Sequence, residues 1–113
     1  MKFIAMEVPR VFKVGKKQSV TIKDCGNIQL NPDEQVTFSS PQGKQYDVTA
    51  KSWGYYATPS VNGRLRDQGF KTALVKNTLD RHFIMIVDKE KIDDFIAYLL
   101  DEENELLEWL DER

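Results

Sequence analysis

Residues 83–100, FIMIVDKEKIDDFIAYLL, contain the change of pattern that decides the fold. The run from 83 to 87 is almost continuously apolar, which is typical of a strand covered on both faces, so we expect a central strand there. Asp88 is a suitable N-cap, and Glu90 favours the positive end of a helix dipole. Apolar residues then recur at helical spacing and predict a helix packed on the sheet: Ile92, Phe95, Ile96, Leu99 and Leu100.

The same apolar spacing continues beyond this helix through Leu106, Leu107 and Leu110, with Glu103 at the one position that should be apolar. A single helix over residues 89–111 would be about 35 Å long, more than a domain of this size can cover. We therefore expect a break near Asn104. The residues that follow should pack against the body as a separate short element, and the pattern leaves open whether it is helix or strand.

Period-two alternation dominates the chain before residue 87, and turn-forming residues interrupt it every eight to ten residues. It predicts short strands at 11–14, 19–23, 27–30, 35–38 and 44–49, with turns at 14–17, 24–27, 31–34 and 40–43. A second hairpin is expected from 70–75 and 82–87 through the turn at 77–80. The predicted fold class is α+β: an antiparallel β-rich small barrel or sandwich-like sheet followed by a C-terminal helix.

Length and composition indicate one globular domain over residues 1–113, with a β-rich body at 1–87 and a helical acidic segment at 88–113. The apolar run at the N-terminus is too short for the core of a signal peptide, and no window reaches the roughly 18–20 apolar residues that span a bilayer. Cys25 is the only cysteine and suits a reducing compartment. The expected location is the cytoplasm, without membrane association.

Charge is divided unevenly along the chain. Residues 1–86 carry 13 Lys or Arg and 7 Asp or Glu, a net +6, whereas residues 87–113 carry 3 and 11, a net −8. Three interpretations remain open: a basic surface for an anionic partner, an acidic tail that docks onto its own body, or two unconnected solvated faces.

Residues that could support catalysis or bind metal are sparse. Cys25 and His82 are the only members of their kinds, so neither a nucleophile with its base nor a zinc site with three or four Cys or His ligands is indicated. The acidic residues lack the spacing of a calcium loop, and no glycine-rich phosphate loop occurs. No catalytic residue, metal site or cofactor is predicted, which favours a protein that is not an enzyme.

Residues 51–66, KSWGYYATPSVNGRLR, form the densest group of recognition side chains. Aromatic rings stack on sugars and bases, Asn reads hydroxyls and amides, and Arg binds phosphate or carboxylate. Arg64 and Arg66 are expected on an extended segment, where alternate residues share one cationic face. The predicted ligand-binding residues are Trp53, Tyr55, Tyr56, Asn62, Arg64 and Arg66. The alternative is structural, with Trp53 and Tyr55 filling the core and Arg64 pairing with acids of the C-terminal segment.

Several short motifs also resemble a family of short uncharacterised bacterial proteins. They are Cys25-Gly26, residues 32–38 and 46–48, Trp53 to Ser60, Asn62 to Leu65, and Ala73 to Asn77. The resemblance covers about residues 22–111. It implies a loose association with gene neighbourhoods for surface polysaccharides, and it brings no activity or catalytic residue.

Together these features favour a non-enzymatic binding or accessory module. Its expected partner is a small anionic ligand, such as a nucleotide or sugar derivative, or a protein bound through residues 53–66, and a homodimer is possible. One alternative is a single-stranded nucleic-acid binding domain in which Trp53 and Tyr55 stack on bases, although the pI of about 5.4 argues against it. Another alternative is a small enzyme of a sugar pathway.

Overall fold

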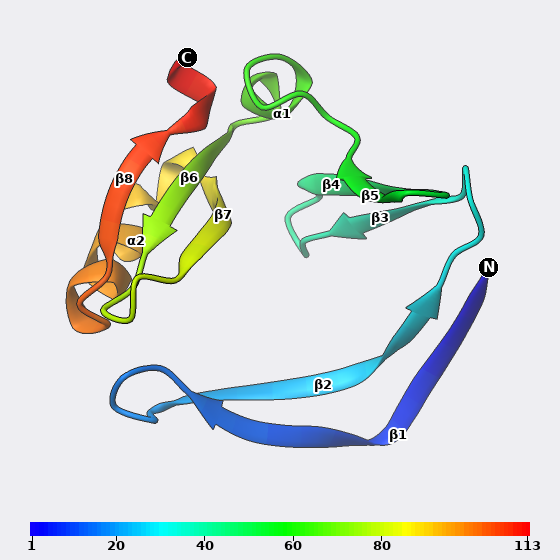
Figure 1. The fold of residues 1–113 in the computed structure, drawn as a ribbon, viewed down its shortest axis with the longest axis horizontal. Helices are drawn as coiled ribbons and strands as arrows, with labels where there is room; N and C mark the ends of the chain where they lie inside the picture. The colour runs from blue at the N-terminus through cyan, green and yellow to red at the C-terminus, as the bar shows by residue number, and fades with distance from the viewer. The chain divides into compact units, whose positions relative to one another are not determined.

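The computed structural model describes residues 1–113, and its strands form three separate antiparallel sheets (Figure 1). None of the sheets closes on itself, so the predicted small barrel is wrong, whereas the α+β class with a C-terminal helix is confirmed. The chain divides into two compact units, which are described in turn: the first comprises 1–38 and 47–58, the second 39–46 and 59–113. The single domain expected from chain length stays a prediction. No helix is long and apolar enough to cross a membrane.

A long hairpin of β1 (Lys2–Val14) and β2 (Val20–Gln29) begins the first unit. The strands pair from Lys2 with Gln29 to Val14 with Val20, and their register shifts between Ala5 and Arg10. Four residues of β1, numbers 6–9, therefore lie opposite Cys25 alone, which makes a large bulge. The predicted strands 19–23 and 27–30 are one strand, and the turn predicted at 24–27 is wrong, because cross-strand pairing continues through those residues.

The second sheet has the order β3-β4-β5, formed by β3 (Gln35–Ser39), β4 (Gln45–Lys51) and β5 (Gly54–Ala57). A tight turn precedes β3, with the amide of Glu34 donating to the carbonyl of Asn31 at 3.1 Å. Pro32 sets the first central position of this turn and Asp33 takes the second with φ 70°. The hairpin predicted around residues 40–43 is confirmed.

The second unit is built on a sheet with the order β7-β6-β8. Its strands are β6 (Phe70–Lys76), β7 (His82–Asp88) and β8 (Glu105–Trp109). The hairpin of β6 and β7 is confirmed, but the central strand is β6. The prediction that residues 83–87 lie in the middle of the sheet is wrong: β7 is an edge strand, where Phe83 is 45% and Ile84 57% exposed.

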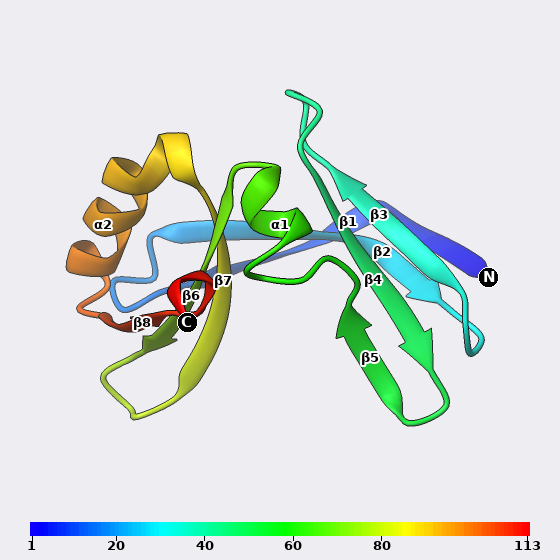
Figure 2. The ribbon, with the colours of Figure 1, turned by 90° about the horizontal axis from the view of Figure 1, so that it is seen from above.

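Helix α2 (Ile92–Asp101) covers one face of this sheet (Figure 2). It follows the one-turn helix η1 (Lys89–Lys91), whose N-cap is Asp88, with its carboxylate accepting a hydrogen bond from the Glu90 amide at 2.9 Å. The predicted helix stripe is only partly buried, because Leu99 is 4% exposed but Leu100 is 74% exposed. The core consists of buried Ala73, Val75, Val87 and Leu99, with Met85, Ile92, Phe95, Leu106 and Trp109 packed around them.

Helix α2 ends in a Schellman motif, which produces the predicted break near Asn104. The amide of Asn104 donates to the carbonyl of Leu99 at 2.8 Å, and the amide of Glu103 donates to that of Leu100 at 3.2 Å. Glu103 takes the left-handed conformation, with φ 55°, that glycine usually supplies at this position. The chain then reverses into β8, so the element after the break is a strand followed by the one-turn helix η2 (Leu110–Glu112).

A bulge in β8 explains how its apolar residues reach the core. Pairing with β6 runs from Val75 with Leu106 directly to Leu74 with Glu108, which leaves Leu107 without an opposite residue. Regular alternation would place Leu106 and Trp109 on opposite faces, but the extra residue restores both to the face that α2 covers. Trp109 contacts Phe95 there, with ring centroids 5.7 Å apart.

Four ion pairs join the acidic C-terminal segment to basic residues of the same unit. Lys71 contacts Asp111 at 2.8 Å and Glu112 at 3.3 Å, Lys44 contacts Asp88 at 2.7 Å, and Lys76 contacts Glu105 at 3.6 Å. Of the three interpretations of the charge division, these contacts support the acidic segment docking onto its own body. Asp111 is the most deeply placed of the acids, at 2% exposure.

Candidate binding site

The hairpin of β4 and β5 carries the three aromatic residues of the predicted site. Lys51 pairs with Gly54, so Ser52 and Trp53 form a two-residue turn. Gly54 has φ 143°, a conformation that a side chain would strain, although nothing lies within 4 Å of where a Cβ would be. Glycine is therefore required by the backbone of this turn.

Trp53, Tyr55 and Tyr56 are all exposed, at 70%, 69% and 43% respectively. The rings of Trp53 and Tyr56 are stacked, with centroids 6.2 Å apart and planes inclined by 20°. Tyr55 pairs with Ala50 and Tyr56 with Thr49, so these neighbouring tyrosines lie on opposite faces of the hairpin. The alternative in which Trp53 and Tyr55 fill the core is wrong, because a core aromatic would be covered.

Polar contacts fix the hairpin that presents these rings. The hydroxyls of Thr49 and Thr58 are 2.6 Å apart, and the Thr49 hydroxyl donates to the side chain of Gln35 at 3.2 Å. At the turn, the Lys51 ammonium binds the carboxylate of Asp33, and this hydrogen bond raises the pKa of Lys51. Asp33 is not among the residues predicted for the site. The sequence feature that could have identified Asp33 is the Pro32-Asp33 turn. The Asp33 amide donates a hydrogen bond to the Ala50 carbonyl at 2.8 Å, which holds this turn next to β4.

The other predicted residues, Asn62, Arg64 and Arg66, belong to the second unit, and all three are exposed. Asn62 lies in a turn closed by the amide of Gly63 donating to the carbonyl of Ser60 at 3.2 Å. A Cβ on Gly63 would meet the Ser60 hydroxyl at 2.3 Å, so any other residue there would force that hydroxyl to move.

The two arginines do not lie on an extended segment. They belong to the short helix α1 (Arg64–Asp67), where residues two apart point about 200° from each other, so the predicted shared cationic face is wrong. Leu65 between them is fully buried. The Arg66 guanidinium donates to the backbone carbonyl of Asp111 at 3.4 Å, which gives Arg66 a structural contact with the C-terminal segment.

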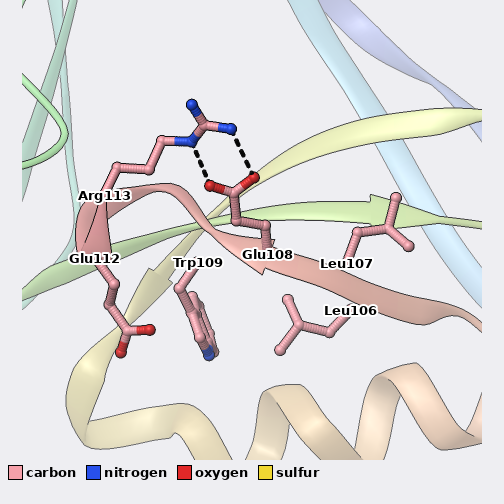
Figure 3. Close-up of a pocket in the computed structure, with 6 residues that line it drawn as sticks. All are labelled: Leu106, Leu107, Glu108, Trp109, Glu112 and Arg113. Atoms are coloured by element: carbon pink, nitrogen blue, oxygen red, sulfur yellow. Dashed lines mark hydrogen bonds and ion pairs between the residues drawn. The ribbon is translucent and has the colours of Figure 1, made fainter.

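Two hollows in the second unit were not anticipated from sequence. The larger, about 410 Å³, runs along β8 and is lined by Leu106, Leu107, Glu108, Trp109, Glu112 and Arg113. Figure 3 shows Glu108 and Arg113 paired with each other above the strand, so their charges are already matched. The smaller, about 280 Å³, is lined by Gly43, Lys44, Gln45 and Gln68. Neither includes a residue of the predicted site.

The structure contains no group of three or more His, Cys, Asp or Glu side chains arranged to hold a metal ion. Comparison of the chain with protein-family models, with curated proteins and with solved structures finds no match.

Proposed function

We propose that this protein is a non-enzymatic binding module that contacts a protein partner through the aromatic hairpin, defined as β4 and β5 with their turn. The observation that carries the proposal is the exposure of Trp53, Tyr55 and Tyr56 on a hairpin whose backbone and polar contacts are well formed. Exposed Trp and Tyr are the residues most enriched among those that dominate protein-protein affinity.

The shape of the surface favours a protein over an enclosed small ligand. Trp53 lies in the hairpin turn, and the two tyrosines point to opposite faces of β5. Such a projection can insert into a groove of a partner, whereas a small molecule usually needs a concave pocket that covers most of its surface. Two aromatic faces on one hairpin would let a partner close around it.

A second candidate rests on one specific observation, the stacked pair of Trp53 and Tyr56. Stacked rings could hold the flat face of a sugar or nucleobase. This candidate retains the nucleotide or sugar derivative expected from the sequence, including an acidic sugar of a surface polysaccharide pathway.

Site-specific photo-crosslinking tests the leading proposal. Benzoylphenylalanine placed at Trp53 or Tyr55, in cells of the source organism, should give a discrete crosslinked protein that mass spectrometry identifies. The matched control is the same group at Phe38, which is 53% exposed on β3 of the same sheet. Equal crosslinking from all three positions would indicate random contact and contradict the proposal.

Purified partner then allows the affinity to be measured by calorimetry. Trp53→Ala with Tyr55→Ala should weaken binding at least tenfold with little change in melting temperature, while Phe38→Ala should leave binding unchanged. If the crosslinks are absent and nucleotide sugars or acidic oligosaccharides instead quench the fluorescence of Trp53 in a Trp109→Phe background, the second candidate replaces the first.

A further inference from the structure

The β1–β2 hairpin of the first unit has two chemically different faces. Residues paired across an antiparallel ladder share a face, and alternate residues along a strand return to it. The even-numbered residues of β2 and their partners therefore form one surface, called here the apolar face: Phe3, Ala5, Phe12, Val14, Val20, Ile22 and Ile28. The position of Phe3 agrees with this assignment, because a Cβ on Gly26 would meet its ring at 3.0 Å.

Charge separates the two faces. The apolar face contains one charged pair, Arg10 with Asp24 at 3.2 Å, which is internally neutral, and the Arg10 guanidinium lies over the Phe12 ring at 4.9 Å. The lysines Lys13 and Lys23 fall on the opposite face, next to Val11 and Thr21. One side of the hairpin is thus apolar and neutral, and the other is cationic.

The apolar face is only partly covered in the single chain. Phe3 is 59% exposed, and Ile22 and Ile28 are each 41% exposed. A two-stranded sheet has marginal stability in water unless its apolar face packs against something, and rimmed apolar patches of this kind mark interaction sites.

We propose that the apolar face is covered by the same face of a second copy, in a twofold-symmetric dimer. Its neutrality makes it self-complementary, because two copies can meet face to face while Lys13 and Lys23 of both stay on the outside. Stable interfaces bury at least roughly 1,200 Å² in total, so each copy would have to cover roughly 600 Å², and the half-exposed side chains of Phe3, Ile22 and Ile28 contribute apolar area to it. This inference is independent of the aromatic hairpin and its partner.

Analytical ultracentrifugation of the full chain over a range of protein concentrations tests it. The wild type should sediment at twice the mass of the chain at tens of micromolar and dissociate on dilution, as expected for an interface of this size. Ile22→Asp should shift the dissociation constant at least a hundredfold toward monomer. Val11→Asp is the matched control, because Val11 is 58% exposed on the cationic face of the same hairpin, and it should remain dimeric.

Each other outcome overturns the proposal. A wild type that stays monomeric throughout the concentration range excludes the dimer, and a lower melting temperature of Ile22→Asp in that monomer would show that the chain covers its own apolar face. Equal weakening by Ile22→Asp and Val11→Asp would place the interface elsewhere. If Ile22→Asp does not fold, hydrogen exchange of the wild type at low and high concentration replaces it, and protection of β1 and β2 that does not rise with concentration contradicts the proposal.

Discussion

Asp111 is the residue at which the acidic segment is held most firmly. Its carboxylate accepts hydrogen bonds from the Lys71 ammonium at 2.8 Å and from the Thr72 amide at 2.9 Å, and Lys71 also lies over the Trp109 ring at 4.7 Å. Burial would raise the pKa of Asp111, but the hydrogen bonds from Lys71 and Thr72 outweigh it and lower the pKa below its usual value. The contact therefore favours the ionised carboxylate.

Asp111→Asn should lower the free energy of unfolding at pH 7 by about 1–3 kcal/mol, because it leaves the partly buried Lys71 without its main partner. A carboxylate with a lowered folded-state pKa stabilises the fold above its unfolded pKa of about 3.9 and loses that contribution as pH falls through the folded value. The difference in the free energy of unfolding between wild type and Asp111→Asn, measured by urea denaturation, should accordingly become smaller below about pH 4. Glu112→Gln is the control, since Glu112 is 62% exposed, and a difference that does not change with pH contradicts this account.

The backbone of Glu103 is strained in the folded protein. A side chain in the left-handed conformation is strained, and glycine removes that strain at the end of a helix. Glu103→Gly should therefore stabilise the protein by about 0.5–1 kcal/mol, although glycine normally weakens helices. Asp101→Gly, inside the last turn of α2, should instead destabilise by about 1 kcal/mol in the same denaturation experiment. A loss of stability in both variants would mean that the Schellman motif is not formed in solution.

At the scale of the element, α2 divides its apolar residues between core and solvent. Leu99→Ala should lower the free energy of unfolding by about 2–5 kcal/mol, because it opens a cavity beside Ala73, Val75 and Val87. Leu100→Ala makes the same chemical change one residue later, where the side chain is 74% exposed, and should cost less than about 0.5 kcal/mol. Equal losses in thermal denaturation would show that α2 is rotated relative to the sheet.

Sequence periodicity predicted that most of the strands and the long helix exist, but it did not predict which strands lie beside one another in a sheet. The alternation at 35–38, 44–49 and 70–75 identified strands, and Asp88 identified a helix start, because these signals are local. Local pattern could not distinguish a central strand from the edge strand β7, since an apolar run is compatible with both. The Arg64 to Asp67 helix was missed because a single turn has no period to detect.

The region after α2 shows the same limit more clearly. Leu106, Leu107 and Leu110 keep helical spacing, yet the chain forms a strand because the Schellman motif reverses its direction. The sequence has no glycine at position 103 to indicate this reversal. The bulge at Leu107 then places apolar residues with helix-like spacing on one face of a sheet. The break could therefore be predicted, because one helix over residues 89–111 would be too long, but the strand that follows it could not.

At the scale of the whole molecule, the residues of the predicted site differ in how far the sequence could predict their structure. The aromatic residues could be recognised from composition, and their exposure is a result of a short hairpin that is too narrow to bury them. The shared cationic face could not be predicted, because it depended on an extended backbone that α1 replaces. The charge division was visible in sequence, but its main contact, Lys71 with Asp111, joins residues far apart in the chain and required the fold.

The last ten residues of the acidic segment therefore stabilise the second unit, and deleting them should lower its stability. Deleting residues 104–113 removes β8 and η2, strips Leu106 and Trp109 from the core, and leaves Lys71 without Asp111. We expect β6 and β7 to lose hydrogen-exchange protection and the melting transition to fall sharply or disappear, because a two-stranded remnant with one helix buries too little apolar surface. Deleting Arg113 alone is the control, since its pair with Glu108 lies at the surface and should contribute little to stability. A chain ending at 103 that melts like the full chain would show that the segment is accessory, and that the ion pairs to Lys71 and Lys76 do not stabilise the second unit.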